Sequence, residues 1–197
     1  SGWTHKLESE QHWRLYWRQQ KIMEGRVEVG DTILEIGVGT GFTANYLRAR
    51  GISVTTVDID KDKKPDIVAN VVTFRPARAF NHILAFEVFE HLPFDRFEQA
   101  VQNLAVACMH EGHLFMSLPQ YRRIVASVSF KLPKLGKRAF TLTIPKKRLT
   151  ERHHFWELGY QDATEQKIID VLSRNGFQLV HTEEAIPISF FVFRKTR

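Results

Sequence analysis

The stretch Ile33-Leu34-Glu35-Ile36-Gly37-Val38-Gly39-Thr40-Gly41 decides the fold of this chain of 197 residues. It runs from an apolar segment, which predicts a buried strand, straight into three glycines at alternate positions. Glycine there allows a tight turn and lets a ligand lie against the backbone, where a Cβ would intrude. A helix is predicted directly afterwards, at residues 42–50, so the unpaired N–H groups of its first turn face the same place. The stretch therefore predicts a ligand-binding turn between a strand and a helix.

Strands and helices are predicted to alternate along most of the chain. Short apolar runs typical of strands lie at residues 32–36, 52–57, 66–70, 81–86 and 113–118. Asp95 with Glu98 is spaced like a capping box at a helix start, and Asp162 with Glu165 begins the last helix. Two final runs, 177–182 and 188–193, have no helix between them, so one of these strands should be antiparallel. The pattern predicts a doubly wound α/β fold with a mostly parallel, seven-stranded sheet.

The composition indicates a globular domain and excludes several classes of protein. Hydrophobic residues make up 43% of the chain and charged residues 25%, which suits a buried core under a polar surface. The longest apolar runs are far too short to span a bilayer, and the chain does not begin with a signal segment. The single cysteine, Cys108, lies on a predicted helix face, where we expect a buried, inert thiol; it excludes an internal disulfide. We expect one cytoplasmic domain over residues 1–197, with an N-terminal helical cap at 1–28.

Two acids near the glycines suggest which ligand the turn binds. Glu35 interrupts an apolar run, and an acid there suits a cationic ligand such as the methionine part of S-adenosylmethionine. Asp58, at the end of the second strand, can accept hydrogen bonds from both hydroxyls of a ribose. A dinucleotide fingerprint, Gly39-x-Gly41-x-x-Ala44, also fits and makes an NAD(P)-dependent oxidoreductase the alternative. Against it, the fingerprint starts two residues after the first glycine, and a pyrophosphate does not need Glu35.

Four motifs resemble those of class I S-adenosylmethionine-dependent methyltransferases. The glycine stretch resembles their first motif, and Val57-Asp58-Ile59-Asp60 resembles their second. Phe86-Glu87-Val88-Phe89-Glu90-His91-Leu92-Pro93 is similar to the motif after the fourth strand in the branch that includes ubiquinone-pathway and many small-molecule methyltransferases. Phe115-Met116-Ser117-Leu118-Pro119 fits their fifth strand. The resemblance covers residues 30–119 well and 154–193 more loosely, and it implies a Rossmann-like fold and methyl transfer from S-adenosylmethionine.

The resemblance also implies roles for individual residues in a cofactor site. Glu35 and the glycines would hold the methionine moiety, Asp58 the ribose, and Glu87 would line the pocket floor. Asn70, where the family usually has an acid, would lie with Val71 against the adenine, and its amide can still pair with that base. The residues expected to bind the cofactor are Glu35, Gly37, Val38, Gly39, Gly41, Phe42, Asp58, Ile59, Asn70, Val71 and Glu87.

The acceptor side is predicted from two further segments. Methyl transfer needs positioning and a dry pocket, and it needs a base only if the acceptor must lose a proton. His91 is the candidate base, although a His that packs against the next helix explains it equally well. The run His153-His154-Phe155-Trp156-Glu157 resembles an element that follows the fifth strand in the same branch. We expect the acceptor to contact Tyr121, Arg122, His154, Trp156 and Glu157, and we expect no metal, because no tight ligand spacing occurs.

The positive charge of the chain is concentrated in residues 120–152. The whole chain has a net charge of +6, whereas this segment holds ten Lys and Arg and one acid, Glu151. It follows the predicted fifth strand, where the family commonly inserts a substrate lid, and it predicts a basic lid for an acidic or amphiphilic small-molecule acceptor. A solubilising extension, an anchor on an anionic membrane surface and a nucleic-acid patch are the alternatives. Nucleic acid is the less favoured partner, because the Asn-Pro-Pro-Tyr type of motif is absent.

Overall fold

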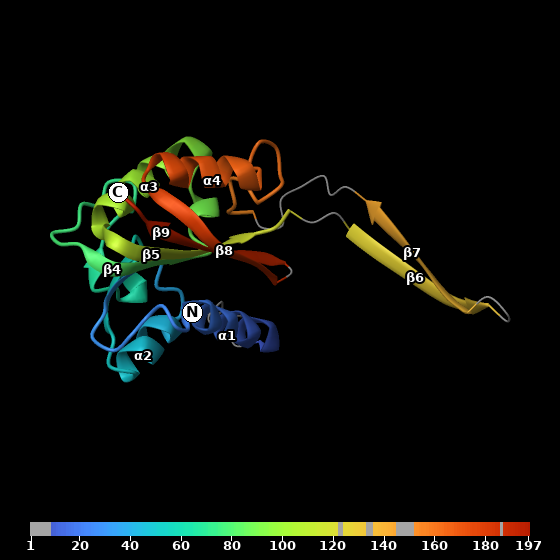
Figure 1. Cartoon of the computed structure of the whole chain (residues 1–197), viewed down its shortest axis with the longest axis horizontal. Helices are drawn as coiled ribbons and strands as arrows, with labels where there is room; N and C mark the ends of the chain where they lie inside the picture. Colours follow the sequence, from blue (N-terminus) through green and yellow to red (C-terminus); the bar gives the residue numbers. More distant parts are fainter. Residues whose placement is uncertain (1–8, 122–123, 133–135, 145–151, 186) are drawn as a thin grey trace.

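The sheet of the protein has the predicted α/β topology. The computed structural model describes residues 9–121, 124–132, 136–144, 152–185 and 187–197, with side chains outside 122–151. Seven strands form one sheet in the order β3-β2-β1-β4-β5-β9-β8 (Figure 1). The strands are β1 Thr32–Ile36, β2 Ser53–Asp58, β3 Ile67–Val68, β4 Phe80–Phe86, β5 Cys108–Pro119, β8 Phe177–Ala185 and β9 Ile188–Lys195. All pairs from β3 to β5 are parallel, and β9 is antiparallel to both of its neighbours, which confirms the single antiparallel strand.

Helices cover both faces of the sheet, as a doubly wound fold requires. They are α1 Glu10–Met23, α2 Phe42–Ala49, α3 Phe94–Ala107 and α4 Glu165–Arg174, and two short 3₁₀ turns are η2 Lys61–Lys63 and η3 Phe89–His91. The helices α3 and α4 lie on one face and α1 and α2 on the other (Figure 1). Between β2 and β3 the chain forms only the short turn η2 instead of a full helix.

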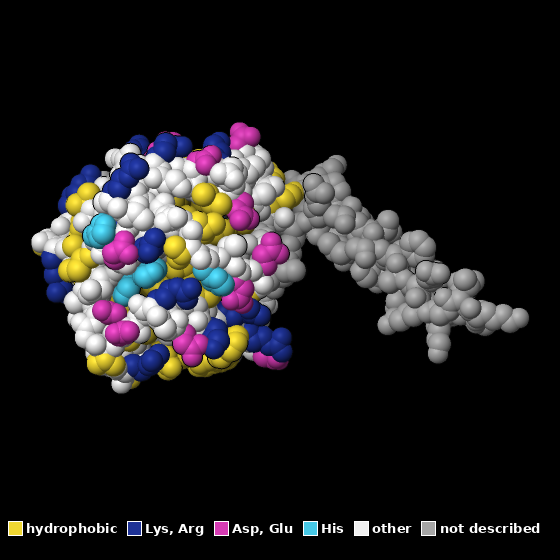
Figure 2. Space-filling model, viewed as in Figure 1, with side chains coloured by type: hydrophobic (Ala, Val, Ile, Leu, Met, Phe, Trp, Pro, Cys, Tyr) yellow, Lys and Arg dark blue, Asp and Glu magenta, His cyan; other side chains and the backbone are white. Residues whose placement is uncertain are grey.

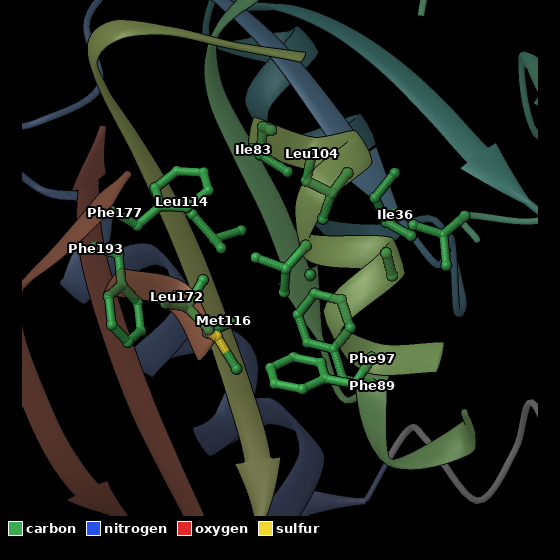
Figure 3. Packing of buried hydrophobic residues seen from close by; sticks show 14 of the residues in the cluster. Ile36, Ile83, Phe89, Phe97, Leu104, Leu114, Met116, Leu172, Phe177 and Phe193 are labelled. Atoms are coloured by element: carbon green, nitrogen blue, oxygen red, sulfur yellow. The ribbon is translucent and has the colours of Figure 1, made fainter. Parts of the chain in front are cut away.

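Two hydrophobic clusters result from the alternation of side chains along the strands. In β1, Leu34 and Ile36 join the cluster under α3 and α4, while Ile33 points to the cluster under α1 and α2. Figure 3 shows the first cluster, in which Phe97 and Leu104 of α3 meet residues of the central strands. Burial on both faces explains why the central strands read as continuous apolar runs.

The helix starts differ in detail from the sequence prediction. The first helix begins at Glu10 after the Ser9 cap, and residues 1–8 of the predicted N-terminal helical cap lie outside the described residues. The capping box at Asp95 is wrong: α3 starts one residue earlier, behind Pro93, and Glu98 pairs instead with Arg174 of α4, at 3.2 Å. The cause is the turn η3, which delivers the chain to Pro93, whose fixed φ suits a helix entry.

The N-cap of the last helix and the position of Cys108 also differ from the sequence prediction. Thr164 rather than Asp162 caps α4, because its Oγ1 accepts a hydrogen bond from the N–H of Lys167 at 3.2 Å. Cys108 begins β5 instead of lying within a helix, and it is buried as expected. Burial raises the pKa of its thiol to about 12, which favours the protonated thiol over the reactive thiolate.

Part of the basic segment forms a second, two-stranded sheet. β6 Ile124–Leu132 and β7 Gly136–Ile144 pair antiparallel, from Ile124 opposite Ile144 to Leu132 opposite Gly136. This ribbon runs away from the seven-stranded sheet (Figure 1). The sequence did contain its signal, since polar and apolar residues alternate in Val128-Ser129-Phe130 and again in Phe140-Thr141-Leu142. Among the described residues, none of the helices has the length and apolar character needed to cross a membrane.

Candidate active site

The glycine turn lies at the carboxyl edge of the parallel strands, where open α/β sheets bind ligands. Gly37, Gly39 and Gly41 all have positive φ, of 80°, 57° and 78°, a conformation that L side chains rarely adopt. A Cβ on Gly37 would lie 2.8 Å from Cγ2 of Val88, whereas a Cβ on Gly39 would enter open space. Gly41 is the N-cap of α2 and has no capping side chain. The turn thus presents bare backbone and a helix start to the space beside it.

Glu35 is a buried acid directly behind this turn. It lies in β1 with only 4% of its surface exposed, and its Oε2 has no hydrogen-bond partner. Burial raises the pKa of Glu35 to about 8, and Asp58 and Asp66 add to the rise, while Arg48 opposes it. A cationic group placed near Glu35 would restore its ionised form, so this residue suits the ligand that the sequence predicts.

Asp58 is held in place at the end of the neighbouring strand. Its Oδ2 accepts a hydrogen bond from the N–H of Val38 at 2.8 Å, and its Oδ1 accepts one from the N–H of Asp60 at 2.8 Å. Each oxygen keeps a second lone pair that can accept from a hydroxyl. The first of these bonds ties the carboxylate to the glycine turn, and Ile59 beside it is 70% exposed. Tertiary structure therefore brings Asp58 and the turn together as predicted.

The predicted adenine side lies in the loop after β3. Oδ1 of Asn70 accepts a hydrogen bond from the N–H of Val72 at 2.9 Å, which leaves the NH₂ group as the part of the amide that can face a ligand. Val71 is buried, and its carbonyl accepts from Nδ2 of Asn103 at 3.0 Å. The sequence analysis missed Asn103, a buried amide on the apolar side of α3 that also bonds to the carbonyl of Val72. A polar residue within that apolar stripe was the available signal.

Aromatic residues of α1 pack over the first turn of α2. The rings of Tyr16 and Phe42 have centroids 4.6 Å apart, and those of Trp13 and Phe42 are 5.0 Å apart. The hydroxyl of Tyr16 lies 3.0 Å from Oγ1 of Thr40, within the glycine turn. Trp13 and Trp17 are 50% and 60% exposed, so core packing does not explain them. The N-terminal helix is thus attached to the glycine turn.

The segment after the basic insertion packs against η3, the turn that follows β4. The N–H of Phe155 donates to the carbonyl of Glu90 at 2.8 Å, and Nε1 of Trp156 donates to the carbonyl of Leu92 at 2.9 Å. The ring centroids of His91 and His154 lie 5.0 Å apart. These contacts bring together two segments that the sequence analysis placed separately at the acceptor side.

The residues predicted to contact the acceptor differ in their surroundings. His91 is exposed, with Nδ1 3.3 Å from the carbonyl oxygen of His153, whereas Glu157 is buried with Oε1 2.9 Å from Nδ1 of His154. Trp156 is 3% exposed and belongs to the core cluster, so the structure gives it a packing role. Tyr121 is partly buried, and its ring lies 4.7 Å from that of Tyr160. Arg122 lies outside the described residues.

The turn after β4 also contains strain and a buried acid that the sequence analysis missed. Glu87 has a φ of +55°, unusual for a residue with a side chain, and its N–H donates to the carbonyl of Ser117 at 3.2 Å. Glu90 is fully buried, and neither of its carboxylate oxygens has a hydrogen-bond partner. Burial holds the pKa of Glu90 well above its usual range, and the negative charges of Glu87 and Glu157 raise it further. An acid within an otherwise apolar Val88-Phe89 turn was the signal in the sequence.

A large hollow opens on the same edge of the sheet. It has a volume of about 910 Å³ and lies between α1 and the turn that joins β8 to β9. Its lining includes Arg14 and Arg18 of α1 and Glu184 of β8. The N–H of Gln120, where the basic segment begins, donates to the carbonyl of Pro187 at this turn. Basic and acidic side chains are interspersed on the face of the molecule drawn in Figure 2.

Comparisons with known proteins agree on the class of the domain. A family model described as a methyltransferase domain matches residues 11–182, while no curated protein matches the chain. The fold is similar to that of the N-methyltransferase NodS from Bradyrhizobium japonicum in complex with S-adenosyl-L-homocysteine, with a TM-score of 0.64, 13% identity and coverage of 98% of this chain and 91% of that one.

Two other solved structures share the fold. One is the 1,6-didemethyltoxoflavin-N1-methyltransferase from Burkholderia thailandensis, with a TM-score of 0.62, 13% identity and coverage of 92% of this chain and 78% of that one. The other is a TehB-like methyltransferase from Corynebacterium glutamicum, with a TM-score of 0.61, 17% identity and coverage of 94% and 95%. Because the family model spans most of the sequence and the glycine turn has the expected geometry, the chain belongs to the class I S-adenosylmethionine-dependent methyltransferases.

Proposed function

We propose that the protein transfers a methyl group from S-adenosylmethionine to a small-molecule acceptor. The observation that carries this proposal is Glu35, a buried carboxylate with an unpartnered oxygen, beside a left-handed glycine turn and an anchored Asp58. A ligand that combines a cationic amino-acid group with a ribose satisfies all three features. A dinucleotide offers Glu35 a pyrophosphate of its own sign, so this site favours methyl transfer over hydride transfer.

The cofactor supplies the methyl group, bound to a positively charged sulfur, and the chain supplies its position. In our proposal Glu35 and the N–H groups of the turn hold the methionine part, and Asp58 accepts from the ribose hydroxyls. The NH₂ group of Asn70 reaches the adenine, with Val71 and Ile59 as its apolar neighbours. Glu87 lines the floor near the reacting carbon. The remaining members of the predicted set, Val38 and Phe42, flank the turn and contact the ligand from the side of α2.

The acceptor is proposed to lie between this pocket and the turn after β4. His91 is placed to receive a proton from the acceptor: if its Nδ1 carries the hydrogen that faces the carbonyl of His153, its Nε2 can accept one. His154, oriented by Glu157, and Tyr121 line the same side.

The proposed acceptor is small and acidic or amphiphilic. Among the similar solved structures, the toxoflavin-pathway enzyme holds the small molecule 1,6-didemethyltoxoflavin, and another is a glycopeptide N-methyltransferase, MtfA, with a TM-score of 0.61 and 11% identity. These two support a small-molecule acceptor. The basic residues of 120–152 support a negative charge on it, and we propose this segment, including Arg122, as a substrate lid.

Calorimetry tests the cofactor part of this proposal. We expect S-adenosylhomocysteine to bind with a stoichiometry of one and NADH not to bind. The reverse result would exclude methyl transfer as the activity of this protein. A screen with radiolabelled S-adenosylmethionine against a whole cell extract, with the labelled product identified, tests the acceptor part. Label transferred only to RNA or protein would contradict a small-molecule acceptor.

A further inference from the structure

Three potential metal ligands meet beside the end of β4. Glu90 and His91 are the last two residues of η3, and His154 belongs to the segment after the basic insertion. One ligand atom from each lies within 4.8 Å of the other two. Among the described residues, this is the one group of three such side chains that meets this distance. Its members come from two segments more than 60 residues apart, so sequence spacing could not reveal it.

The environment of Glu90 calls for a cation. Its side chain is fully buried, and both of its carboxylate oxygens lack a hydrogen-bond partner. Buried polar groups are almost always satisfied, and an exception of this kind is explained by an ion or water that completes the site. The negative charges of Glu87 and Glu157 act on Glu90 and make its surroundings more negative. A positive ion between these groups would compensate all of them.

With Nε2 of each histidine as the ligand atom, Nδ1 of each has the outer contact that metal-binding histidines usually make. Nδ1 of His154 lies 2.9 Å from Oε1 of Glu157, and Nδ1 of His91 lies 3.3 Å from the carbonyl oxygen of His153. Each of these acceptors favours the tautomer with hydrogen on Nδ1, which leaves the lone pair on Nε2. Metal-bound histidines almost always donate their second ring N–H to a carboxylate or a backbone carbonyl. Both outer partners are therefore already in place.

From this geometry we propose that Glu90, His91 and His154 bind a divalent transition-metal ion of the zinc class. Ligand atoms about 2.0–2.2 Å from one ion lie about 3–4 Å apart, so small side-chain rotations close the observed group. Two imidazoles and one carboxylate suit zinc and its neighbours better than magnesium or calcium. Three protein ligands leave a coordination position open, as in catalytic sites.

The open position is the place for an oxygen or nitrogen of the methyl acceptor. This part rests on the proposed function, because the cluster is next to the cofactor pocket: Val88, two residues before Glu90, is the side chain that packs against Gly37. A bound cation lowers the pKa of a coordinated hydroxyl and orients it. In that arrangement His91 is a ligand, and the ion takes over the activation of the acceptor that was assigned above to His91 as a base.

Zn²⁺ titration of the untagged full chain tests the site without any need for activity. We expect one Zn²⁺ per chain with a micromolar or lower Kd, and visible absorption bands of a low-symmetry site when Co²⁺ replaces it. His91→Ala and His154→Ala should weaken binding at least 100-fold, and Glu90→Gln at least tenfold. His153→Ala is the matched control, because it removes an adjacent exposed imidazole and keeps the backbone carbonyl; its Kd should stay within twofold.

Two results would overturn the proposal. One is the absence of stoichiometric Zn²⁺ binding by the native chain, and the other is a Kd that none of the three substitutions changes. His91 is exposed, so His91→Ala should fold even if the buried variants do not, and its melting temperature with and without Zn²⁺ gives an independent reading. Binding of S-adenosylhomocysteine, measured on the same samples, separates this proposal from the function above. Zn²⁺ binding without cofactor binding would leave the metal site standing and remove the methyltransferase proposal, and the converse result would do the opposite.

Discussion

The two halves of the active-site edge each contain a buried acid, but they are built in different ways. At the glycine turn, Glu35 lies within a single continuous stretch of sequence, and the charges of two acids, Asp58 and Asp66, act on it against one cation, Arg48. At the turn after β4, two acids also act on Glu90, Glu87 and the sequence-distant Glu157, but no cation is among the causes of its raised pKa. The first setting suits a ligand with one positive charge, and the second suits a more highly charged ion. The neighbours of an acid, rather than its burial alone, thus indicate what it binds.

The largest expected effect concerns the pH dependence of stability at Glu35. Because its pKa is raised to about 8, the folded state keeps a proton that the unfolded state releases above pH 4.5. The free energy of unfolding should therefore be highest at low pH within this range and fall by about 4 kcal/mol as pH rises to 8. Urea denaturation of the native chain and of Glu35→Gln at several pH values measures this. Identical pH profiles for the two proteins would contradict the assignment.

Gly39→Val should lower the affinity for S-adenosylhomocysteine about a thousandfold, since its side chain enters the space against which the ligand lies. Gly25→Val is the matched control, because Gly25 also has a positive φ, of 71°, and open space around it, but lies after α1. Both variants should lose a similar 1–2 kcal/mol of stability, roughly the cost of a left-handed residue. Calorimetry should find the loss of affinity only in the first; equal losses in both would mean that strain, rather than contact, is responsible.

Asp58→Ala should lower the affinity for S-adenosylhomocysteine about 100-fold through the loss of two charge-assisted hydrogen bonds. Asp60→Ala provides the comparison, as Asp60 is an exposed acid nearby whose carboxylate accepts from the N–H of Asp62 within η2. Titration calorimetry on both variants compares the two acids. Unchanged affinity in Asp58→Ala would mean that the ribose does not bind at the end of β2.

His91→Ala should reduce turnover by about 10- to 100-fold, whether His91 acts as a base or through a metal, and should leave S-adenosylhomocysteine affinity within a factor of about two. Steady-state kinetics with an identified acceptor, together with calorimetry, measures both quantities. A drop in cofactor affinity would show that the two halves of the edge are one site rather than two. An unaltered rate would leave His91 as a structural residue.

The local sequence was sufficient for the first half of this edge. Gly37, Gly39 and Gly41 demand left-handed backbone, and such a demand is visible in one sequence because glycine meets it without strain. The apolar run before them predicts a strand buried on both faces, and its position next to β2 places Asp58 at the same edge. The alternation of strands and helices determined the fold class and the single antiparallel strand for the same reason, since both follow from local periodicity.

Only the tertiary structure decided the second half. The packing of residues 152–158 against η3 placed His154 beside His91, put Trp156 into the core and surrounded Glu90 with acids. The tertiary structure also starts α3 at Phe94, behind Pro93, and pairs the two strands of the basic segment. Contacts between segments 60 residues apart depend on how those segments pack in the folded protein. Hydrophobic periodicity and motif spacing describe only neighbouring residues, so they do not predict such contacts.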